Sequence, residues 1–196
     1  MKTVFVDVDT QLDFLYPAGA LYVPGAEHIV PAVARLNRFA AARGIPVIST
    51  TDAHAENDPE FALWPPHCVA STTGQHKADS TLLDKRVVIP NRDCALPLDG
   101  AQQIIVEKQT VDVFQAPNLA RVMERLGAGR FVVFGVVTEI CVLYAVRGLL
   151  KAGKQVVVVT DAIETLKAED SGRALDEMRA GGATLEDVAH VIGSAL

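Results

Sequence analysis

Short runs of apolar, mostly β-branched residues recur along this chain, and segments with a helical period separate them. The runs cover residues 4–8, 46–50, 104–106, 131–137 and 156–160. They are nearly uninterrupted, whereas a strand with one solvent-facing side would alternate apolar and polar residues. The pattern therefore predicts parallel strands that are buried on both faces.

Each helical segment ends just before a glycine. The segments cover residues 28–43, 118–126, 139–152 and 168–180. A glycine just past the last turn is a frequent helix stop because it adopts the left-handed conformation without strain. A short strand near residues 183–185 and a terminal helix from Glu186 complete the pattern. We predict an α/β fold for residues 1–196: a single domain with a doubly wound, mostly parallel sheet and helices on both faces.

The segment of residues 51–91 interrupts this alternation. It is rich in Pro, His, Asp and Thr and shows little periodicity. A loop of this length inside a compact domain is usually functional. We therefore expect it to contribute residues to a binding or catalytic site.

Length and cysteine content narrow the class of protein. A chain of 196 residues buries roughly 70% of the surface that its unfolded form exposes, so a stable core needs no disulfide bonds. The cysteines are three, an odd number, and the first residues lead into a strand that contains Asp7 and Asp9. A signal peptide would have an apolar core there. We expect a cytoplasmic protein.

Charge and hydropathy narrow the class of partner. The formal net charge is −6 and no Lys/Arg cluster is present, which disfavours a nucleic-acid partner. No run approaches the ~18 apolar residues that a membrane helix needs. The expected partner is a small molecule, with no nucleic acid and no membrane, and we expect the chain to form a homo-oligomer.

Three groups with complementary chemistry, Asp9, Lys108 and Cys141, follow three predicted strands that we expect to be neighbours in the sheet. In a doubly wound sheet the carboxyl ends of neighbouring strands converge on one crevice, so these groups can meet there. The carboxylate can accept the thiol proton and return it to a leaving amine. The ammonium and the N-terminus of the next helix are expected to lower the thiol pKa.

Taken singly, these residues also have structural interpretations. Cys141 lies in an apolar segment, where a buried structural cysteine is common. Asp9 is a candidate turn cap, and Lys108 can form a surface ion pair with Glu107.

Five motifs occur in order along almost the whole chain. They are Asp9-Thr10-Gln11-Leu12-Asp13-Phe14, Gly19-Ala20-Leu21-Tyr22-Val23-Pro24-Gly25, Glu107-Lys108, Gly135-Val136-Val137-Thr138-Glu139-Ile140-Cys141-Val142 and Val159-Thr160-Asp161-Ala162. Together they resemble the isochorismatase-like cysteine hydrolases, a family that includes the nicotinamidases and pyrazinamidases. The resemblance implies that Asp9 is the acid/base, Lys108 the third member of a triad, and Cys141 the nucleophile that forms an acyl-enzyme.

The same resemblance implies two backbone features near the nucleophile. One is a cis peptide bond between Val136 and Val137. The other is an oxyanion hole, formed by the amides of Val137 and Cys141, for the charge that develops on the substrate oxygen.

Part of the long segment resembles the metal-binding segment of nicotinamidases. It comprises Asp52-Ala53-His54, then Glu60, then Trp64-Pro65-Pro66-His67-Cys68-Val69. Carboxylate and imidazole suit a first-row divalent ion. We expect one such ion, zinc in preference to manganese or iron, held by Asp52, His54 and His67 with Glu60 as fourth protein ligand. An ordinary hydrogen-bonded loop is the alternative.

The chain also departs from the nicotinamidase pattern. Acidic residues follow the D-x-H motif where another histidine is frequent, and Glu139-Ile140 replaces the more usual Asp followed by an aromatic residue or His. Phe14 and Trp64 are candidate flat walls for a planar amide, although Trp64 is equally compatible with packing under the loop.

The resemblance favours an amidohydrolase that converts nicotinamide and water into nicotinate and ammonia. A related alternative keeps the triad and acts on another small amide, a carbamoyl compound or an isochorismate-like substrate. A more distant one is a phosphatase of the haloacid-dehalogenase type, because Asp7-Val8-Asp9 matches the start of its motif. A non-catalytic member of the fold is the third alternative, which the intact triad disfavours.

Overall fold

A computed structural model describes residues 1–193. Within this range one sheet contains seven strands in the order β3-β4-β2-β1-β5-β6-β7, and every neighbouring pair is parallel. The strands are β1 (Thr3–Val8), β2 (Val47–Asp52), β3 (Arg86–Ile89), β4 (Gln103–Lys108), β5 (Arg130–Val136), β6 (Gln155–Glu164) and β7 (Thr184–Glu186). The predicted α/β class and parallel sheet are confirmed.

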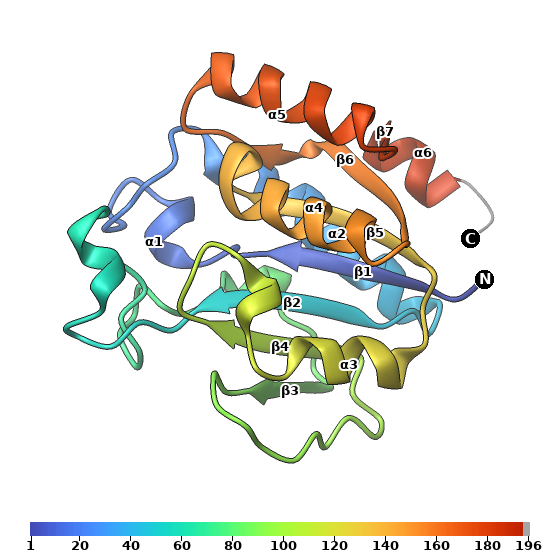
Figure 1. Cartoon of the computed structure of the whole chain (residues 1–196), viewed down its shortest axis with the longest axis horizontal. Helices are drawn as coiled ribbons and strands as arrows, with labels where there is room; N and C mark the ends of the chain where they lie inside the picture. Colours follow the sequence, from blue (N-terminus) through green and yellow to red (C-terminus); the bar gives the residue numbers. More distant parts are fainter. Residues whose placement is uncertain (194–196) are drawn as a thin grey trace.

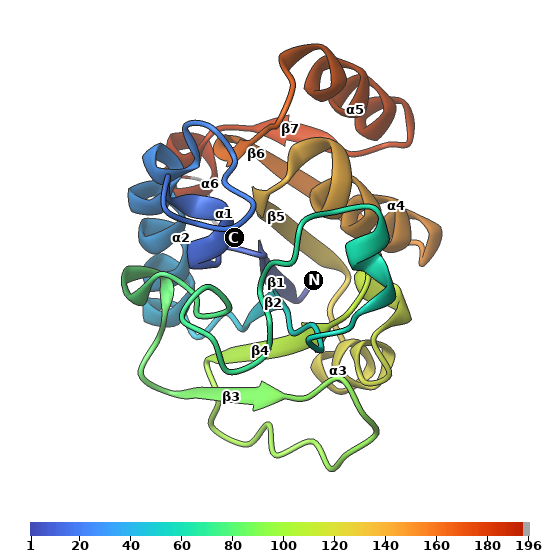
Figure 2. The same cartoon turned by 90° about the vertical axis from the view of Figure 1, so that its left-hand side faces the viewer.

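Helices cover both faces of the sheet (Figure 1). The elements are α1 (Leu12–Leu15), α2 (Val30–Ala42), α3 (Leu119–Leu126), α4 (Leu143–Lys151), α5 (Ala168–Ala180) and α6 (Val188–Gly193). Helices α2 and α6 pack on one face, and α3, α4 and α5 lie on the other, as the turned view in Figure 2 also shows. The sheet is therefore buried on both sides, in agreement with the uninterrupted apolar runs.

Two elements differ from the expected pattern. Strand β3 lies inside the segment that was expected to be a loop, at the open edge of the sheet, where Val88 is 51% exposed. Its apolar residues follow charged ones, so the run is too short to stand out. The helix expected from residue 139 begins instead as a π turn, Thr138–Val142, and continues as α4.

The carboxyl ends of β4, β2, β1 and β5 meet at one edge of the sheet, on the left of Figure 1, where α1 and the segment after β2 also lie. The expectation that the strands before Asp9, Lys108 and Cys141 are direct neighbours is wrong in one respect. Strand β2 lies between β4 and β1. This insertion has a functional consequence, because it brings Asp52 at the end of β2 between the other groups.

Gly135 allows β5 to approach β1 closely at this edge. Its φ angle is +118°, and a β-carbon there would lie 2.1 Å from the carbonyl oxygen of Val8. Any other residue would push apart the two strands that lead to Asp9 and Cys141.

Candidate active site

The side chains of Asp9, Lys108 and Cys141 meet in the interior at this edge. The Nζ atom of Lys108 lies 2.9 Å from Oδ2 of Asp9 and 3.6 Å from Sγ of Cys141. All three residues are buried. The surface ion pair proposed as an alternative for Lys108 is therefore not formed, since its ammonium lies inside the protein.

Asp9 reaches this position through an unusual backbone conformation. It follows the last residue of β1 and has a φ angle of +48°, in the left-handed region. Thr50 on β2 holds the carboxylate, because its hydroxyl donates a 2.5 Å hydrogen bond to Oδ1. The amide of Asp9 donates in turn to the Thr50 carbonyl at 3.2 Å. Non-glycine residues adopt this region rarely, although aspartate tolerates it better than most.

The electrostatics of the cluster differ from the expectation. Burial raises the pKa of the Cys141 thiol well above its ordinary value, and the lowering effect of Lys108 does not compensate. Burial also raises the pKa of Asp9. Burial alone would lower the pKa of Lys108, but Asp52 and Asp9 hold it well above its usual range. The expectation of a low-pKa thiol is wrong, because desolvation and two nearby carboxylates outweigh one ammonium.

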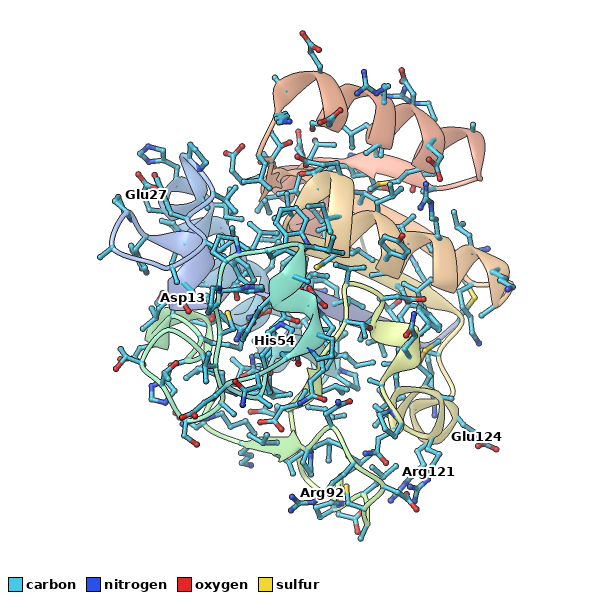
Figure 3. All side chains as sticks on the ribbon, turned by 60° about the vertical axis from the view of Figure 1, so that its left-hand side comes forward. Asp13, Glu27, His54, Arg92, Arg121 and Glu124 are labelled. Carbon is cyan, nitrogen blue, oxygen red and sulfur yellow. The ribbon has the colours of Figure 1, made fainter. Side chains whose placement is uncertain are left out.

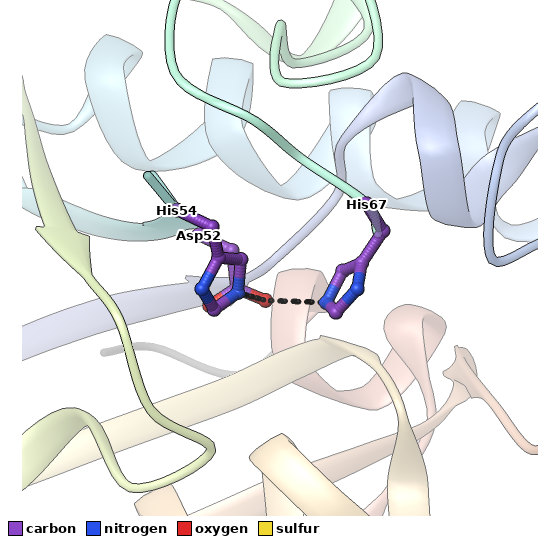
Figure 4. A group of neighbouring side chains, drawn as sticks. All are labelled: Asp52, His54 and His67. Carbon is purple, nitrogen blue, oxygen red and sulfur yellow. Dashed lines mark ion pairs between the residues drawn. The ribbon is translucent and has the colours of Figure 1, made fainter. Parts of the chain in front are cut away.

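A second cluster lies beside the first. Ligand atoms of Asp52, His54 and His67 lie within 4.8 Å of one another, and all three residues are buried. The Nε2 atoms of His54 and His67 lie 3.8 Å and 3.7 Å from the same oxygen, Oδ2 of Asp52 (Figure 4). The other oxygen of Asp52 accepts a hydrogen bond from Lys108.

Contacts around the two imidazole rings aim their Nε2 atoms at this common point. The Nδ1 atom of His67 lies 2.8 Å from the carbonyl oxygen of Pro65, and that of His54 lies 3.0 Å from Oδ2 of Asp58. Both ring nitrogens of His54 are buried and without a hydrogen bond of good geometry among residues 1–193, so the Asp58 carboxylate is an ion-pair contact of Nδ1. A carboxylate or carbonyl behind each imidazole is the usual arrangement around a metal ion, so these residues fit one.

The pKa of Asp52 also suits a cation. Burial would raise it, but Lys108 and the two histidines hold it well below its usual range. Asp52 is therefore a carboxylate at neutral pH. Glu60 is outside the group of converging ligand atoms, although it lines the same pocket. Its role as a fourth ligand stays a prediction.

One small pocket, open to solvent, joins the two clusters. Its lining includes Phe14 and Trp64, the predicted flat walls, together with Asp9, Asp52 and Cys141. A mostly apolar lining with a few polar groups is typical of a site for one small ligand. The remaining lining residues are Leu21, Val23, Glu60, His67, Val111, Val136, Val137, Ile140 and Leu166.

Sequence comparison agrees with this arrangement. Residues 3–190 match the family model of the isochorismatase domain. This chain belongs to the isochorismatase family.

Individual proteins are similar along most of the chain. The nicotinamidase of Escherichia coli (strain K12) is 28% identical over 203 residues, which cover 93% of each protein. The N-carbamoylsarcosine amidase of an Arthrobacter species is 25% identical over 169 residues, which cover 83% of this chain and 59% of that enzyme. The pyrazinamidase of Pyrococcus horikoshii, solved in complex with zinc, is 30% identical and has a TM-score of 0.80, covering 95% of this chain and 99% of that one.

The backbone next to Cys141 has the expected cis peptide bond between Val136 and Val137. The carbonyl of Val137 accepts hydrogen bonds from the amides of Ile140 and Val142, at 3.0 Å and 3.1 Å. These bonds close the π turn that carries the thiol. The oxyanion hole formed by the Val137 and Cys141 amides stays a prediction.

Several residues that support the site were not singled out from the sequence. Gln11 bonds both backbone groups of Asp52: its side chain accepts from the amide at 2.7 Å and donates to the carbonyl at 2.9 Å. Asp13 accepts from the amide of Cys68 at 2.7 Å and thereby holds the loop that carries His67. Figure 3 shows Asp13 and His54 in this region. Both Gln11 and Asp13 lie in the first motif, and their place in that motif is the sequence signal that could have identified them.

The other cysteines take no part in either cluster. Cys68, Cys94 and Cys141 are all free thiols. Burial raises the pKa of Cys68 far above its ordinary value. Cys94 is half-buried near Asn118, whose side-chain nitrogen lies 3.6 Å from its sulfur.

The phosphatase interpretation of Asp7-Val8-Asp9 is wrong. That motif needs both carboxylates in one crevice, whereas Asp7 is fully buried and contacts Asn37 of α2, on the opposite face of the sheet from Lys108. The family match likewise assigns the chain to a different family.

Proposed function

We propose that this protein is an amidohydrolase of the nicotinamidase type, which converts nicotinamide and water into nicotinate and ammonia. The observation that carries this proposal is the junction of two clusters in one small pocket: a thiol, a carboxylate and an ammonium beside a carboxylate and two histidines. The similarity to a nicotinamidase and to a pyrazinamidase over nearly the whole chain supports it.

In the proposed reaction Cys141 attacks the amide carbon. Asp9 accepts the thiol proton as the carbon–sulfur bond forms and returns it to the nitrogen as ammonia leaves, which yields a thioester. A water molecule then attacks the thioester carbon and gives a proton to Asp9, which passes it to the sulfur as the acid is released. The raised pKa values of Cys141 and Asp9 suit this cycle. The thiol stays neutral until a base takes its proton, and a carboxylate with a raised pKa is a stronger base.

Lys108 has a supporting role in this scheme. Its ammonium touches both Asp9 and Asp52 and favours the charged form of each carboxylate, although burial still raises the pKa of Asp9. The amides of Val137 and Cys141 would donate hydrogen bonds to the oxygen that becomes negatively charged during attack.

The second cluster serves the substrate ring in our proposal. Asp52, His54 and His67, with Glu60 as a fourth ligand, would hold one divalent ion, with zinc preferred over manganese or iron. When bound, the ion would supply a Lewis-acid contact for a ring nitrogen. Phe14 and Trp64 would hold the flat ring between them, so that its amide faces Cys141.

Ammonia release from the purified protein tests the proposal. Nicotinamide and pyrazinamide should be hydrolysed, and benzamide, which lacks the ring nitrogen, should be a poor substrate. Cys141→Ala should abolish turnover, whereas Cys94→Ala, a matched loss of a free thiol, should not. Equal rates with Cys141→Ala and the unmodified protein would overturn the proposed chemistry.

A second candidate keeps the thiol chemistry and changes the substrate to a carbamoyl compound. The similarity to an N-carbamoylsarcosine amidase favours it. A carbamoyl substrate has no ring nitrogen for a metal ion to contact. Including N-carbamoyl amino acids in the ammonia screen therefore separates the two candidate functions. Hydrolysis of these compounds, with nicotinamide untouched, would move the assignment to this branch.

Location and assembly stay predictions. No helix within residues 1–193 combines the length and apolar character that crossing a membrane requires. The three free cysteines agree with a reducing, cytoplasmic setting. Light scattering of the purified protein would test the expected homo-oligomer.

A further inference from the structure

Asp7 and Asp9 are two residues apart but lie on opposite faces of the sheet. The carboxylate of Asp7 accepts hydrogen bonds from Asn37 of α2 at 2.9 Å and from Ser49 at 3.2 Å. The carboxylate of Asp9 contacts Thr50 and Lys108 on the other side. In a regular strand, residues i and i+2 point to the same face. The backbone must therefore depart from strand geometry at Asp9, where φ is +48°.

Thr10 is at the centre of the turn that follows, Asp9-Thr10-Gln11. The amide of Gln11 donates to the carbonyl of Asp9 at 2.7 Å, across Thr10. The carbonyl of Thr10 accepts from the amide of Ala78 at 3.1 Å. This closed turn, together with the left-handed conformation of Asp9, sends the Asp9 carboxylate toward Lys108.

The hydroxyl of Thr10 is held between two buried charges. It donates to Oδ1 of Asp7 at 2.7 Å and accepts from Nζ of Lys77 at 2.7 Å. These directions are fixed, because an ammonium can only donate and a carboxylate can only accept. The charges themselves are 3.2 Å apart, and both side chains are 2% exposed or less. Thr10 is fully buried.

A buried ion pair at this position needs an explanation beyond stability. Removing two charges from water costs about as much as their attraction returns, so apolar residues of similar size often stabilise a core equally well. What apolar residues cannot do is hold a hydroxyl from both sides in one orientation. The pair therefore fixes the direction of Thr10, and with it the turn that begins at Asp9.

We propose that Thr10, clamped by Asp7 and Lys77, is a positioning residue for the carboxylate of Asp9. The inference rests on the proposed function, in which Asp9 moves the proton of Cys141. A left-handed aspartate needs such support, because strained backbone persists only where its surroundings determine it fully. Displacement of a reacting group by about 1 Å can cost a hundredfold in rate.

Thr10→Val tests the proposal, with Ser49→Ala as a matched control. Each substitution removes one hydroxyl that donates to Asp7, but only Thr10 belongs to the turn. We expect Thr10→Val to lower kcat by ten- to a hundredfold with KM changed less than twofold. Thr10→Ser, which keeps the hydroxyl, should restore kcat, and Ser49→Ala should keep it. Thr10→Ala replaces Thr10→Val if the latter does not fold.

A second readout does not depend on the substrate. The rate at which iodoacetamide alkylates Cys141, followed by peptide mass mapping at one pH, reports how well Asp9 accepts the thiol proton. Asp9→Asn gives the lower limit of this rate. We expect Thr10→Val to approach that limit, and Thr10→Ser and Ser49→Ala to alkylate like the unmodified protein.

The two readouts separate the inference from the proposed function. An unmodified protein that releases no ammonia from any amide would contradict the proposed function, and the alkylation rates would still test Thr10. The inference is overturned if Thr10→Val and Ser49→Ala lose thermal stability alike while kcat and the alkylation rate stay normal in both. It is also overturned if Thr10→Ser is as impaired as Thr10→Val.

Discussion

Lys108 donates a hydrogen bond to Asp52, the same residue whose second oxygen faces His54 and His67. One buried ammonium therefore connects the candidate nucleophile cluster with the candidate metal cluster. Because Lys108 also contacts Asp9, it compensates two carboxylates at once. Neither cluster can lose this cation without an effect on the other.

Lys108→Met should accordingly impair both stability and turnover. Removing one partner of a buried ion pair typically costs about 3–5 kcal/mol of the free energy of unfolding. We expect a loss in that range by denaturant titration, and a fall in kcat of about a thousandfold or more. Lys151→Met, an exposed lysine on α4, should change neither quantity by more than about 0.5 kcal/mol or twofold.

The double variant Asp9→Asn with Lys108→Met should be little slower than either single variant, because members of one catalytic unit do not contribute additively. If Asp9→Asn keeps nearly full activity while Asp13→Asn is inactive, Asp13 and not Asp9 is the catalytic carboxylate of the first motif.

Iodoacetamide should distinguish the three thiols. Cys94 is half-buried and should react without loss of activity, whereas Cys68 is fully buried and should not react. Cys141 lines the pocket, so its alkylation should abolish turnover and be slowed by substrate. Because its pKa is raised above 9.0, its reaction should keep accelerating at alkaline pH. A rate that levels off near pH 7 would contradict the raised pKa.

Removing the metal should weaken nicotinamide binding and leave the reactivity of the Cys141 thiol largely unchanged. His54→Ala should lower metal content in elemental analysis to that of the chelated protein, since one imidazole is a large part of so small a ligand set. We expect KM for nicotinamide to rise about tenfold or more, while Cys141 still reacts with iodoacetamide. His28→Ala, at an exposed histidine, serves as the control. Unchanged kinetics in both His54→Ala and chelator would remove the metal from the proposal.

Asp52 should make the metal-free protein sensitive to acid. Its pKa lies well below 3.8 in the folded state, chiefly because Lys108 outweighs the effect of burial. A carboxylate with a depressed folded-state pKa contributes stability above its unfolded pKa, and this is lost as the pH falls below that value. Melting temperatures should therefore begin to drop below about pH 5 and keep falling toward the much lower folded-state pKa, and Asp52→Asn should flatten this dependence. An equally steep fall in Asp52→Asn would assign the effect to other groups.

Gly135→Ala should damage the fold at the site itself. The new β-carbon would meet the Val8 carbonyl at 2.1 Å, in a backbone conformation that alanine avoids. We expect a loss of at least about 3 kcal/mol in the free energy of unfolding, together with inactivation. Gly172→Ala is the matched control, because nothing lies near the added carbon and the position is inside α5. It should stabilise by about 0.5–1 kcal/mol.

The strands and helices were largely predictable because burial on both faces leaves a plain signal. The apolar runs of β1 and β5 and the helix over Ala168–Ala180 follow directly from periodicity. Strand β3 was not predicted because an edge strand buries few side chains and its apolar run is short. The π turn at Thr138–Val142 could not be told from an α-helix in the sequence, because its apolar residues have the same spacing.

The candidate site was predictable in its members and not in its electrostatics. Asp9, Lys108 and Cys141 follow strands whose ends must converge, so their meeting could be anticipated. The raised pKa of Cys141 depends on burial and on the position of Asp52, and neither is visible in a linear sequence. The strand order β4-β2-β1 contributes to the raised pKa, because it puts the carboxylate of Asp52 beside Lys108.

The strand order also determines when the site can exist during folding. Its groups come from β1, β2, β4 and the turn after β5, and β1 pairs with β5 only after more than half of the chain has been bridged. Such long-range parallel pairing forms slowly, because the entropy of closing the chain is lost before the contacts are gained. Helical signal should therefore return early in refolding and ammonia release late. A fragment that lacks any one of these strands would have no active centre, which makes turnover a stringent reporter of a completely assembled sheet.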